Sequence, residues 1–217
     1  CHPRVVEAIK AQVEKLLTAS FNMVNYESTL LWAERIAELA PGELSTTFFS
    51  NGGAEATDGA LKLAKAYTGR PAIIAFKGSF HGRTIAATSV TASNSKYRKG
   101  YDPLMSGIDF IPYPSASQAP AGFTPDEITD YALGQLDDLF SYIRDPGSVA
   151  AILMEPVQGE GGYVVPPTRF VKTLREICDE QGILLIFDEI QAGYGRTGKF
   201  FASENLDVVP DIMTIGK

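Results

Sequence analysis

Two ionisable side chains stand at the ends of short apolar stretches of the sequence. Asp188 follows residues 183–187, and Lys217 follows residues 212–215. A carboxylate buried at such a place costs free energy unless a cation or a metal lies beside it. A protonated ring nitrogen of a cofactor would satisfy Asp188, and Lys217 is then a candidate Schiff-base nucleophile. These two residues are the predicted catalytic groups.

A first glycine-rich segment, residues 50–56, joins an apolar stretch to a helical pattern. Its glycines, Gly52 and Gly53, let the backbone approach a ligand, and the N–H groups of a helix start attract an anion such as phosphate. A plain tight turn explains the same residues. The G-x-G-x-x-G spacing of a dinucleotide site is absent.

Two further loops carry polar groups after apolar stretches. Residues 78–83 read Gly-Ser-Phe-His-Gly-Arg, in which Phe80 could stack on a planar ring and Arg83 could bind a carboxylate. The later loop holds Glu155 and Glu160, which could steer a charged substrate. A buried phenylalanine, a solvated arginine and ordinary loop acids are the alternatives.

A nucleotide-binding P-loop and a metal site are both rejected. Residues 193–199 fit G-x-x-x-x-G-K, but Phe200 stands where Ser or Thr must hold Mg²⁺, and the glycines follow the acids instead of preceding them. The two histidines, His2 and His81, are far apart, and no cluster has the spacing of metal ligands. No metal is predicted.

Alternating helical and strand patterns predict the elements that must position these groups. The strand candidates are continuous apolar runs, which indicates burial on both faces, and helical patterns separate them. The fold class is therefore α/β, with a mostly parallel sheet flanked by helices. We expect strands at residues 46–50, 72–76, 109–113, 149–154, 183–187 and 212–215, and helices near residues 3–17, 27–39, 54–67, 84–89, 128–143 and 169–181.

Composition narrows the class of protein. The 217 residues carry 19 Lys and Arg against 26 Asp and Glu, a formal charge of −7, which argues against nucleic acid as a partner. No apolar run approaches the roughly 20 residues that span a membrane. Two cysteines, Cys1 and Cys178, suit a reducing compartment, so a cytoplasmic protein is expected. The chain begins without Met and stops at Lys217, so we expect a partial domain over residues 1–217 of a longer protein.

Taken together, five segments resemble the class III pyridoxal-phosphate-dependent aminotransferases, most of all 4-aminobutyrate aminotransferases and related ω-aminotransferases. Each motif is weak alone, but five in this order are specific. The opening Cys-His-Pro-Arg-Val also resembles the family's entry to its large domain. The five segments are 51–56 (Asn-Gly-Gly-Ala-Glu-Ala), 80–84 (Phe-His-Gly-Arg-Thr), 155–162 (Glu-Pro-Val-Gln-Gly-Glu-Gly-Gly), 188–193 (Asp-Glu-Ile-Gln-Ala-Gly) and 214–217 (Thr-Ile-Gly-Lys).

The resemblance implies the large domain of a fold-type I transferase and a site for pyridoxal 5′-phosphate. Gly53 and Ala54 would give N–H groups to the cofactor phosphate. Phe80, next to His81, would stack on the pyridine ring, and Ile190 would pack under it.

The resemblance also assigns the reacting groups. Asp188 would pair with the pyridinium nitrogen, Gln191 would hydrogen-bond the phenolic oxygen, and Lys217 would form the Schiff base. The implied reaction moves an amino group from a small-molecule donor, such as 4-aminobutyrate, to a 2-oxo acid acceptor.

Substrate-end positions of the family match Arg83, Glu155 and Glu160, where a glutamate can pair with an arginine and release it to bind a carboxylate. A homodimer or a dimer of dimers is implied for the full-length protein. The alternatives are an aminomutase or a racemase with the same constellation, and an inactive truncated fragment.

Overall fold

A computed structural model describes residues 2–21 and 23–217, so Cys1 of the opening motif lies outside the described residues. Backbone contacts divide the chain into two compact units, Cys1–Thr47 and Phe48–Lys217. Each unit is described by itself, and every residue predicted to take part in chemistry belongs to the second.

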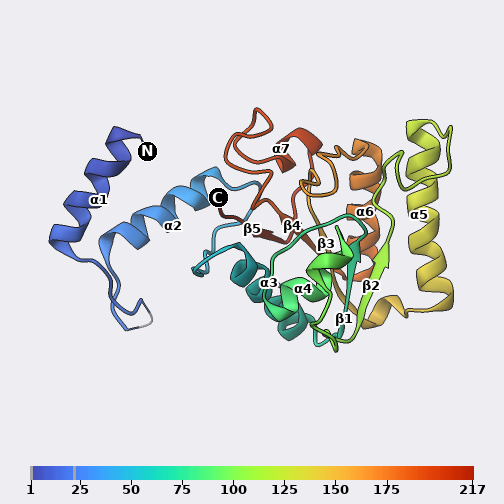
Figure 1. Cartoon of the computed structure of the whole chain (residues 1–217), viewed down its shortest axis with the longest axis horizontal. Coiled ribbons are helices and arrows are strands. Elements are labelled where there is room, and N and C mark those ends of the chain that lie inside the picture. The colour runs from blue at the N-terminus through green and yellow to red at the C-terminus, as the bar shows by residue number, and fades with distance from the viewer. Residues whose placement is uncertain (1, 22) are drawn as a thin grey trace. The chain divides into compact units, whose positions relative to one another are not determined.

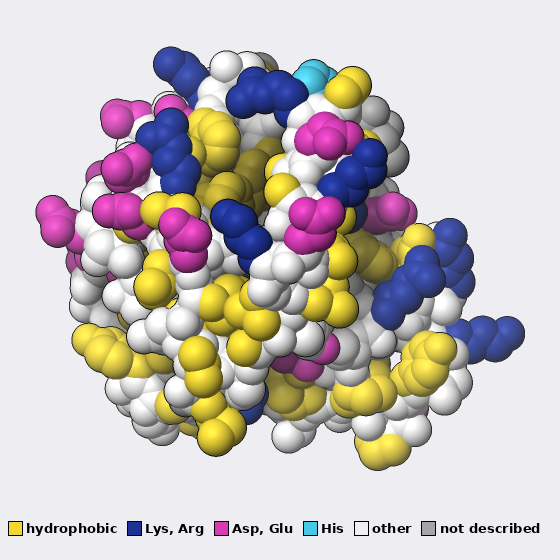
Figure 2. All heavy atoms as spheres, turned by 90° about the vertical axis from the view of Figure 1, so that its left-hand side faces the viewer, with side chains coloured by type: hydrophobic (Ala, Val, Ile, Leu, Met, Phe, Trp, Pro, Cys, Tyr) yellow, Lys and Arg dark blue, Asp and Glu magenta, His cyan; other side chains and the backbone are white. Residues whose placement is uncertain are grey.

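The first unit consists of two helices, α1 (Pro3–Lys15) and α2 (Glu27–Leu39). Helix α1 begins at Pro3, where proline is tolerated, and the His2 side chain caps it by accepting from the Arg4 N–H. None of its described residues is buried, and Val5 and Ile9 are more than half exposed. Hydrophobic side chains are visible at the surface beside charged ones in Figure 2.

The second unit is built on a five-stranded parallel sheet with the order β2-β1-β3-β4-β5 (Figure 1). Continuous apolar runs form the inner strands β1 and β3, which are buried on both faces as predicted, whereas the edge strands β2 and β5 are only partly buried. The strands are β1 (Ala72–Phe76), β2 (Ile108–Ile111), β3 (Val149–Met154), β4 (Leu184–Asp188) and β5 (Ile212–Thr214).

Helices cover both faces of this sheet. Alternate strand residues face α5 (Pro125–Tyr142) and α6 (Thr168–Gln181) on one side, where Phe76, Met154 and Phe187 are buried. The remaining strand residues, such as Ala75 and Leu153, face α3 (Gly53–Thr68) and α4 (Ile85–Val90). The short α7 (Ser203–Leu206) and two 3₁₀ turns, Ser95–Tyr97 and Pro146–Ser148, complete the unit. The result is the expected α/β arrangement.

Local signals explain where the long helices start and stop. Thr124 and Glu127 form a reciprocal capping box at the start of α5. Helix α3 ends at Gly69 and α6 ends at Gly182, both in the left-handed conformation that glycine adopts without strain.

The predicted strand at residues 46–50 is wrong. The segment takes no strand conformation, and Phe48 is 81 % exposed. Strand propensity alone does not make a strand, because a strand needs a neighbouring chain to complete its hydrogen-bond ladder. The described residues supply no such neighbour for this segment.

The strand order locates the place where a ligand can bind. The connection from β1 runs to β2 on one side, whereas β3 lies on the other side of β1. In open parallel sheets, ligands bind outside the carboxyl ends of the strands at such a reversal. The loops that follow β1 and β3 therefore form the first candidate site.

Candidate active site

A cavity of about 190 Å³ lies at the carboxyl ends of the strands. All predicted site residues except Arg83 are among those that line it in the described part of the chain. They come from the start of α3 and from the segments that follow β1, β3, β4 and β5. The lining consists of Gly53, Ala54, Phe80, His81, Gly82, Glu155, Gly159, Glu160, Asp188, Ile190, Gln191 and Lys217.

The start of α3 forms one wall, where Gly53 and Ala54 are the first two helical residues. None of the described side chains caps this helix, so the N–H groups of its first turn remain open to an anion. The Glu55 carboxylate instead accepts the backbone N–H and the side-chain amide of Asn51, and these bonds lower its pKa.

Helix α3 also holds the loop that follows β1. The Thr57 hydroxyl donates to the His81 carbonyl over 3.0 Å, and Asp58 accepts from the Thr84 hydroxyl at 2.8 Å. Gly82, at φ +128°, packs so closely that a Cβ there would lie 2.8 Å from Ala54 Cα. The loop is therefore fixed against the helix start that is open to an anion.

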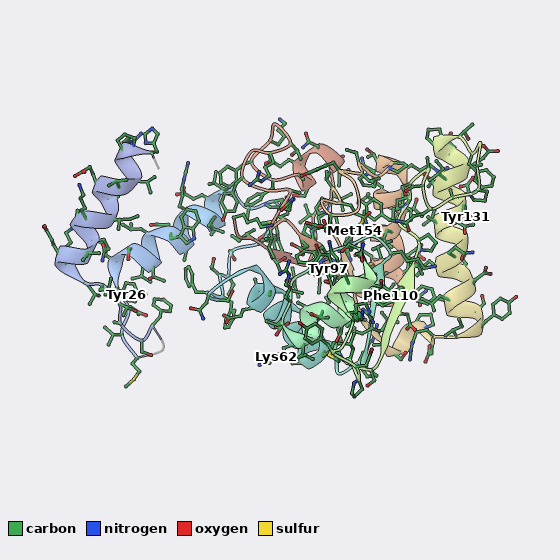
Figure 3. The ribbon with its side chains drawn as sticks, in the orientation of Figure 1. Tyr26, Lys62, Tyr97, Phe110, Tyr131 and Met154 are labelled. Atoms are coloured by element: carbon green, nitrogen blue, oxygen red, sulfur yellow. The ribbon has the colours of Figure 1, made fainter. Side chains whose placement is uncertain are left out.

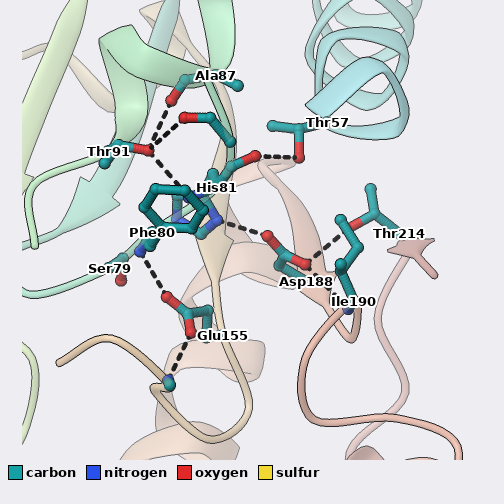
Figure 4. Close-up of polar contacts among 12 residues, drawn as sticks. Thr57, Ser79, Phe80, His81, Ala87, Thr91, Glu155, Asp188, Ile190 and Thr214 are labelled. Atoms are coloured by element: carbon teal, nitrogen blue, oxygen red, sulfur yellow. Dashed lines mark hydrogen bonds and ion pairs between the residues drawn. The ribbon is translucent and has the colours of Figure 1, made fainter. Parts of the chain in front are cut away.

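Asp188, the last residue of β4, is held by three hydrogen bonds (Figure 4). Its Oδ2 lies 2.7 Å from His81 Nδ1, and its Oδ1 accepts from the Ile190 N–H at 3.0 Å and from the Thr214 hydroxyl at 3.2 Å. A carboxylate only accepts, so His81 Nδ1 carries a proton in this pair. The orientation of the carboxylate is fixed from both sides.

The second ring nitrogen of His81 is a buried group without a partner. Its Nε2 makes no hydrogen bond within the described part of the chain, although the residue is only 2 % exposed. An unsatisfied buried polar atom is costly and usually marks a place where a water or a ligand bonds. Since His81 lines the cavity, its Nε2 is one such place.

Glu155 follows β3 and points into the loop after β1. Its Oε1 accepts from the Phe80 N–H at 2.7 Å, and its Oε2 accepts from the Gly159 N–H at 2.8 Å. Burial raises the pKa of Glu155 to about 7; the nearby His81 lowers this pKa and Asp188 raises it. This carboxyl group therefore changes charge near neutral pH.

Lys217 and Gln191 line another wall of the cavity and contact each other. The Lys217 Nζ donates to Gln191 Oε1 over 2.6 Å. Ile190 lies against two glycines, because a Cβ at Gly53 or Gly216 would come within 2.9 or 3.3 Å of its side chain. The lysine amine is thus held beside an amide at the end of β5.

Tyr97 contacts several groups at the edge of the cavity, and no motif or pattern in the sequence singles it out. Its ring lies 5.0 Å from the Phe80 ring, and the Arg83 guanidinium lies 5.3 Å from its centroid. Its hydroxyl donates to Glu160 Oε2 at 3.3 Å. Tyr97, labelled in Figure 3, therefore connects the aromatic wall with two of the three predicted substrate residues, Arg83 and Glu160. Arg83 itself is exposed.

Metal ligands are not grouped in the part of the chain that the structure describes, where no three His, Cys, Asp or Glu side chains could share an ion. No helix in the described ranges combines the length and apolarity needed to cross a bilayer. The groups around the cavity are instead an open helix start, a fixed carboxylate, an aromatic ring and an amine.

The family model for class III aminotransferases matches residues 1–217. The chain belongs to the class III aminotransferase family. It is 41 % identical over 217 residues to a probable 4-aminobutyrate aminotransferase of Bacillus subtilis. The match covers 100 % of this chain and 50 % of that protein. The chain is 42 % identical over 221 residues to an alanine/serine racemase of Pyrococcus horikoshii, with 100 % and 47 % coverage.

A solved structure shows the same fold. The chain superposes with a TM-score of 0.90 and 34 % identity on the taurine:2-oxoglutarate aminotransferase of Bifidobacterium kashiwanohense, which was solved in complex with PLP and glutamate. The match covers 98 % of this chain and 48 % of that one. This class III chain therefore spans about half the length of the curated relatives it matches.

Proposed function

We propose that this chain is the cofactor-binding part of a longer pyridoxal-phosphate-dependent aminotransferase. The single observation that supports the proposal most is the convergence of Lys217, Asp188 and the open start of α3 on one cavity. An amine, a fixed carboxylate and a set of anion-binding N–H groups are the groups that this cofactor requires. Both units would belong to one partial large domain.

The residues of the cavity fit the cofactor. The N–H groups of Gly53 and Ala54 would bind its phosphate, and Phe80 and Ile190 would pack against its ring, with His81 behind Asp188. Gln191 would bind its phenolic oxygen. When bound, pyridoxal phosphate supplies an electron-accepting ring and a carbonyl carbon for amine chemistry.

The chain's own residues would carry the proton transfers. The Asp188 carboxylate, at the end of β4, would pair with a ring nitrogen of the cofactor and hold a proton there. Lys217 Nζ would act first as the nucleophile and then as the general base and acid that moves a proton at the substrate carbon. Its hydrogen bond to Gln191 positions the amine before the reaction.

The proposed reaction transfers an amino group from an ω-amino acid such as 4-aminobutyrate to a 2-oxo acid. The B. subtilis relative is named for 4-aminobutyrate. Arg83 lies over the Tyr97 ring, whose hydroxyl donates to Glu160, and its guanidinium offers a cation for the far carboxylate of such a substrate. Glu155 lines the same cavity. The proposal includes a cytoplasmic protein that forms a homodimer or a dimer of dimers. Light scattering of the full-length protein measures the oligomeric state.

Covalent labelling tests the proposal directly. The full-length protein is reduced with borohydride in the presence of pyridoxal phosphate, and its peptides are mapped. The proposal expects the pyridoxyl group on Lys217. A label on Lys77 or Lys199, or no label, would contradict it.

A racemase is the second candidate, because the P. horikoshii relative carries that name at 42 % identity. Transamination needs a 2-oxo acid acceptor, whereas racemisation does not. Amino-group transfer that depends on added 2-oxo acid supports the aminotransferase. Inversion of an amino acid without any acceptor supports the racemase.

A further inference from the structure

Buried and partly buried hydrogen bonds join the two loops on either side of the strand reversal. Glu155, after β3, accepts the Phe80 N–H with one oxygen and the Gly159 N–H with the other. Phe80 belongs to the loop after β1, and Gly159 belongs to the loop that also carries Glu160. One carboxylate, 3 % exposed, therefore holds both loops (Figure 4).

Gln158 forms a second connection between the same loops. Its fully buried amide donates to the Lys77 carbonyl at 2.9 Å and to the Ser79 hydroxyl at 2.9 Å. The backbones also meet closely, since a Cβ at Gly161 would lie 2.8 Å from the Gly78 carbonyl oxygen. The loop after β1 is thus fixed to the loop after β3 by the side chains of Glu155 and Gln158.

These contacts leave Glu155 little capacity to bind a substrate. Each carboxylate oxygen already accepts a backbone N–H, and the bond to Gly159 is buried while the bond to Phe80 is partly buried. A buried carboxylate that accepts N–H bonds from two loops fixes their separation, because charge-assisted hydrogen bonds are short and roughly twice as strong as neutral ones. The ring of Phe80 and the carboxylate of Glu160 are carried on those two loops.

We propose that Glu155 is a positioning residue, which with Gln158 clamps the Phe80 loop to the Glu160 loop and sets the width of the cavity between them. The inference rests on the proposed function for its consequence, which is the correct placement of an aromatic ring against the cofactor. The clamp itself is a property of the folded chain and is measured without any reaction.

The charge of Glu155 decides the strength of the clamp. Ionisable side chains from several segments line the cavity with Glu155. They are His81 after β1, Asp188 at the end of β4, Lys217 after β5 and Glu160 on the same loop as Glu155. The Tyr113 hydroxyl donates to the Glu155 carbonyl and stays neutral, since burial raises its pKa well above the usual range. The ionised carboxylate holds both N–H groups strongly, and protonation weakens the pair.

Hydrogen exchange of the wild-type full-length protein, with and without pyridoxal phosphate, tests the clamp without any substitution. Protection factors, corrected for intrinsic exchange, are measured between pH 6 and pH 8.5 for peptides that contain Phe80 and Gly159. We expect protection of both amides to rise by about tenfold or more across this range, the effect of strengthening a bond to a charged group. Equal protection at both ends of the range, together with wild-type protection of both amides in Glu155→Gln, would overturn the clamp.

Substitutions then assign the effect to the side chain. Glu155→Gln keeps the size but turns an N–H donor toward one of the two backbone N–H groups, so protection should be low at every pH. Ser79→Ala removes one bond of Gln158 and should loosen the Phe80 peptide alone. Glu180→Gln is the control, because it also replaces one glutamate by glutamine. Glu180 is exposed near the end of α6 and does not line the cavity, so this variant should behave as wild type.

Kinetics separate positioning from substrate binding. As a positioning residue, Glu155→Gln should raise the Kd for pyridoxal phosphate and lower kcat equally with either substrate. A rise of KM for one substrate, with unchanged protection of the two amides, would make Glu155 a substrate ligand and refute the clamp. If no cofactor binds but the exchange pattern appears, the clamp stands and the proposed function fails.

Discussion

His81 Nδ1 donates a hydrogen bond to Asp188 Oδ2 over 2.7 Å, across 107 positions of the sequence. The two residues follow β1 and end β4, which are not neighbours in the sheet because β3 lies between them. The bond therefore joins segments from the two sides of β3 at the carboxyl ends of the strands. Together with the Thr214 hydroxyl, it fixes the position of the Asp188 carboxylate before any ligand binds, and groups that are positioned in advance are effective in electrostatic stabilisation.

The substitution Asp188→Asn in the full-length protein removes this charge and keeps the size of the side chain. We expect turnover to fall on the order of 100-fold or more, as for the loss of one preorganised electrostatic group, with cofactor still bound. Steady-state kinetics and the absorbance of the bound cofactor provide the measurement. Asp138→Asn, on the exposed face of α5, is the control and should leave turnover unchanged. Near-normal turnover in Asp188→Asn would place Asp188 away from the cofactor.

Two substitutions of His81 separate its hydrogen bond from its bulk. His81→Asn keeps a donor near the position of Nδ1, whereas His81→Leu removes it and leaves Asp188 with an unpaired oxygen. We expect kcat to fall by about tenfold or more in His81→Leu, the effect of losing a hydrogen bond to a charged group, and to fall less in His81→Asn. Equal losses in the two variants would show that the bond to Asp188 is irrelevant to turnover.

The sequence correctly predicted which residues lie together where candidate functional residues follow a buried strand. Apolar runs located β1, β3, β4 and β5, and the residues after each run line one cavity, because the carboxyl ends of parallel strands share an edge. The same reasoning was wrong for residues 46–50, whose strand propensity has no pairing partner among the described residues. Propensity is local, whereas a hydrogen-bond ladder is not.

Long-range contacts account for what the sequence could not predict. Tyr97 lies in a polar stretch without periodicity, and only the fold brings its ring to Phe80 and its hydroxyl to Glu160. The bond from Glu155 to the Phe80 N–H joins residues 75 positions apart. A loop acid that meets a backbone N–H leaves no pattern in the sequence, because any residue can supply that N–H.

The stability of the folded protein should depend on the charge of Glu155. Burial raises the pKa of this carboxyl from 4.5 to about 7, so between these values the folded state holds a proton that the unfolded state has released. The free energy of unfolding should therefore fall as pH rises through this window, by at most about 1.4 kcal/mol per pH unit, and this contribution should be constant above pH 7.

Urea unfolding of the wild type and of Glu155→Gln, at intervals from pH 5 to pH 8, measures this dependence. The difference in unfolding free energy between the two proteins should decrease from pH 5 to pH 7, because the variant has no group to titrate at this position. A difference that stays constant with pH would mean that Glu155 is ionised throughout.

Gly82 should tolerate no side chain. At φ +128° an L-residue is strained, and a Cβ would also lie 2.8 Å from Ala54 Cα on α3. Gly82→Ala should destabilise the protein by about 1–3 kcal/mol and weaken the proposed binding of the cofactor phosphate at the start of α3. Gly100→Ala, at φ +88° with open space around it, has the strain without the clash and is the control. Equal losses of stability in chemical denaturation would show that the contact with α3 is unimportant.

Arg83 is expected to select substrates that carry a second carboxylate. The residue is exposed, and its guanidinium stands over the Tyr97 ring, whose hydroxyl donates to Glu160. A planar guanidinium binds a carboxylate with two parallel hydrogen bonds, and Glu160 could neutralise it when an uncharged substrate end arrives. Arg83→Lys keeps the charge and loses this geometry.

For an ω-amino acid, kcat/KM of Arg83→Lys should therefore fall by roughly 10-fold or more, taking about 1.5–3 kcal/mol for a hydrogen bond to a charged group. A monoamine without a carboxylate should be converted as well as by the wild type. Arg169→Lys, which alters a surface ion pair with Asp126 and Asp130, is the control and should leave the ratio of the two substrates unchanged. Equal, small changes for both substrates in Arg83→Lys would make Arg83 an ordinary surface residue, because a carboxylate receptor cannot be altered without affecting the carboxylate-bearing substrate more than the other.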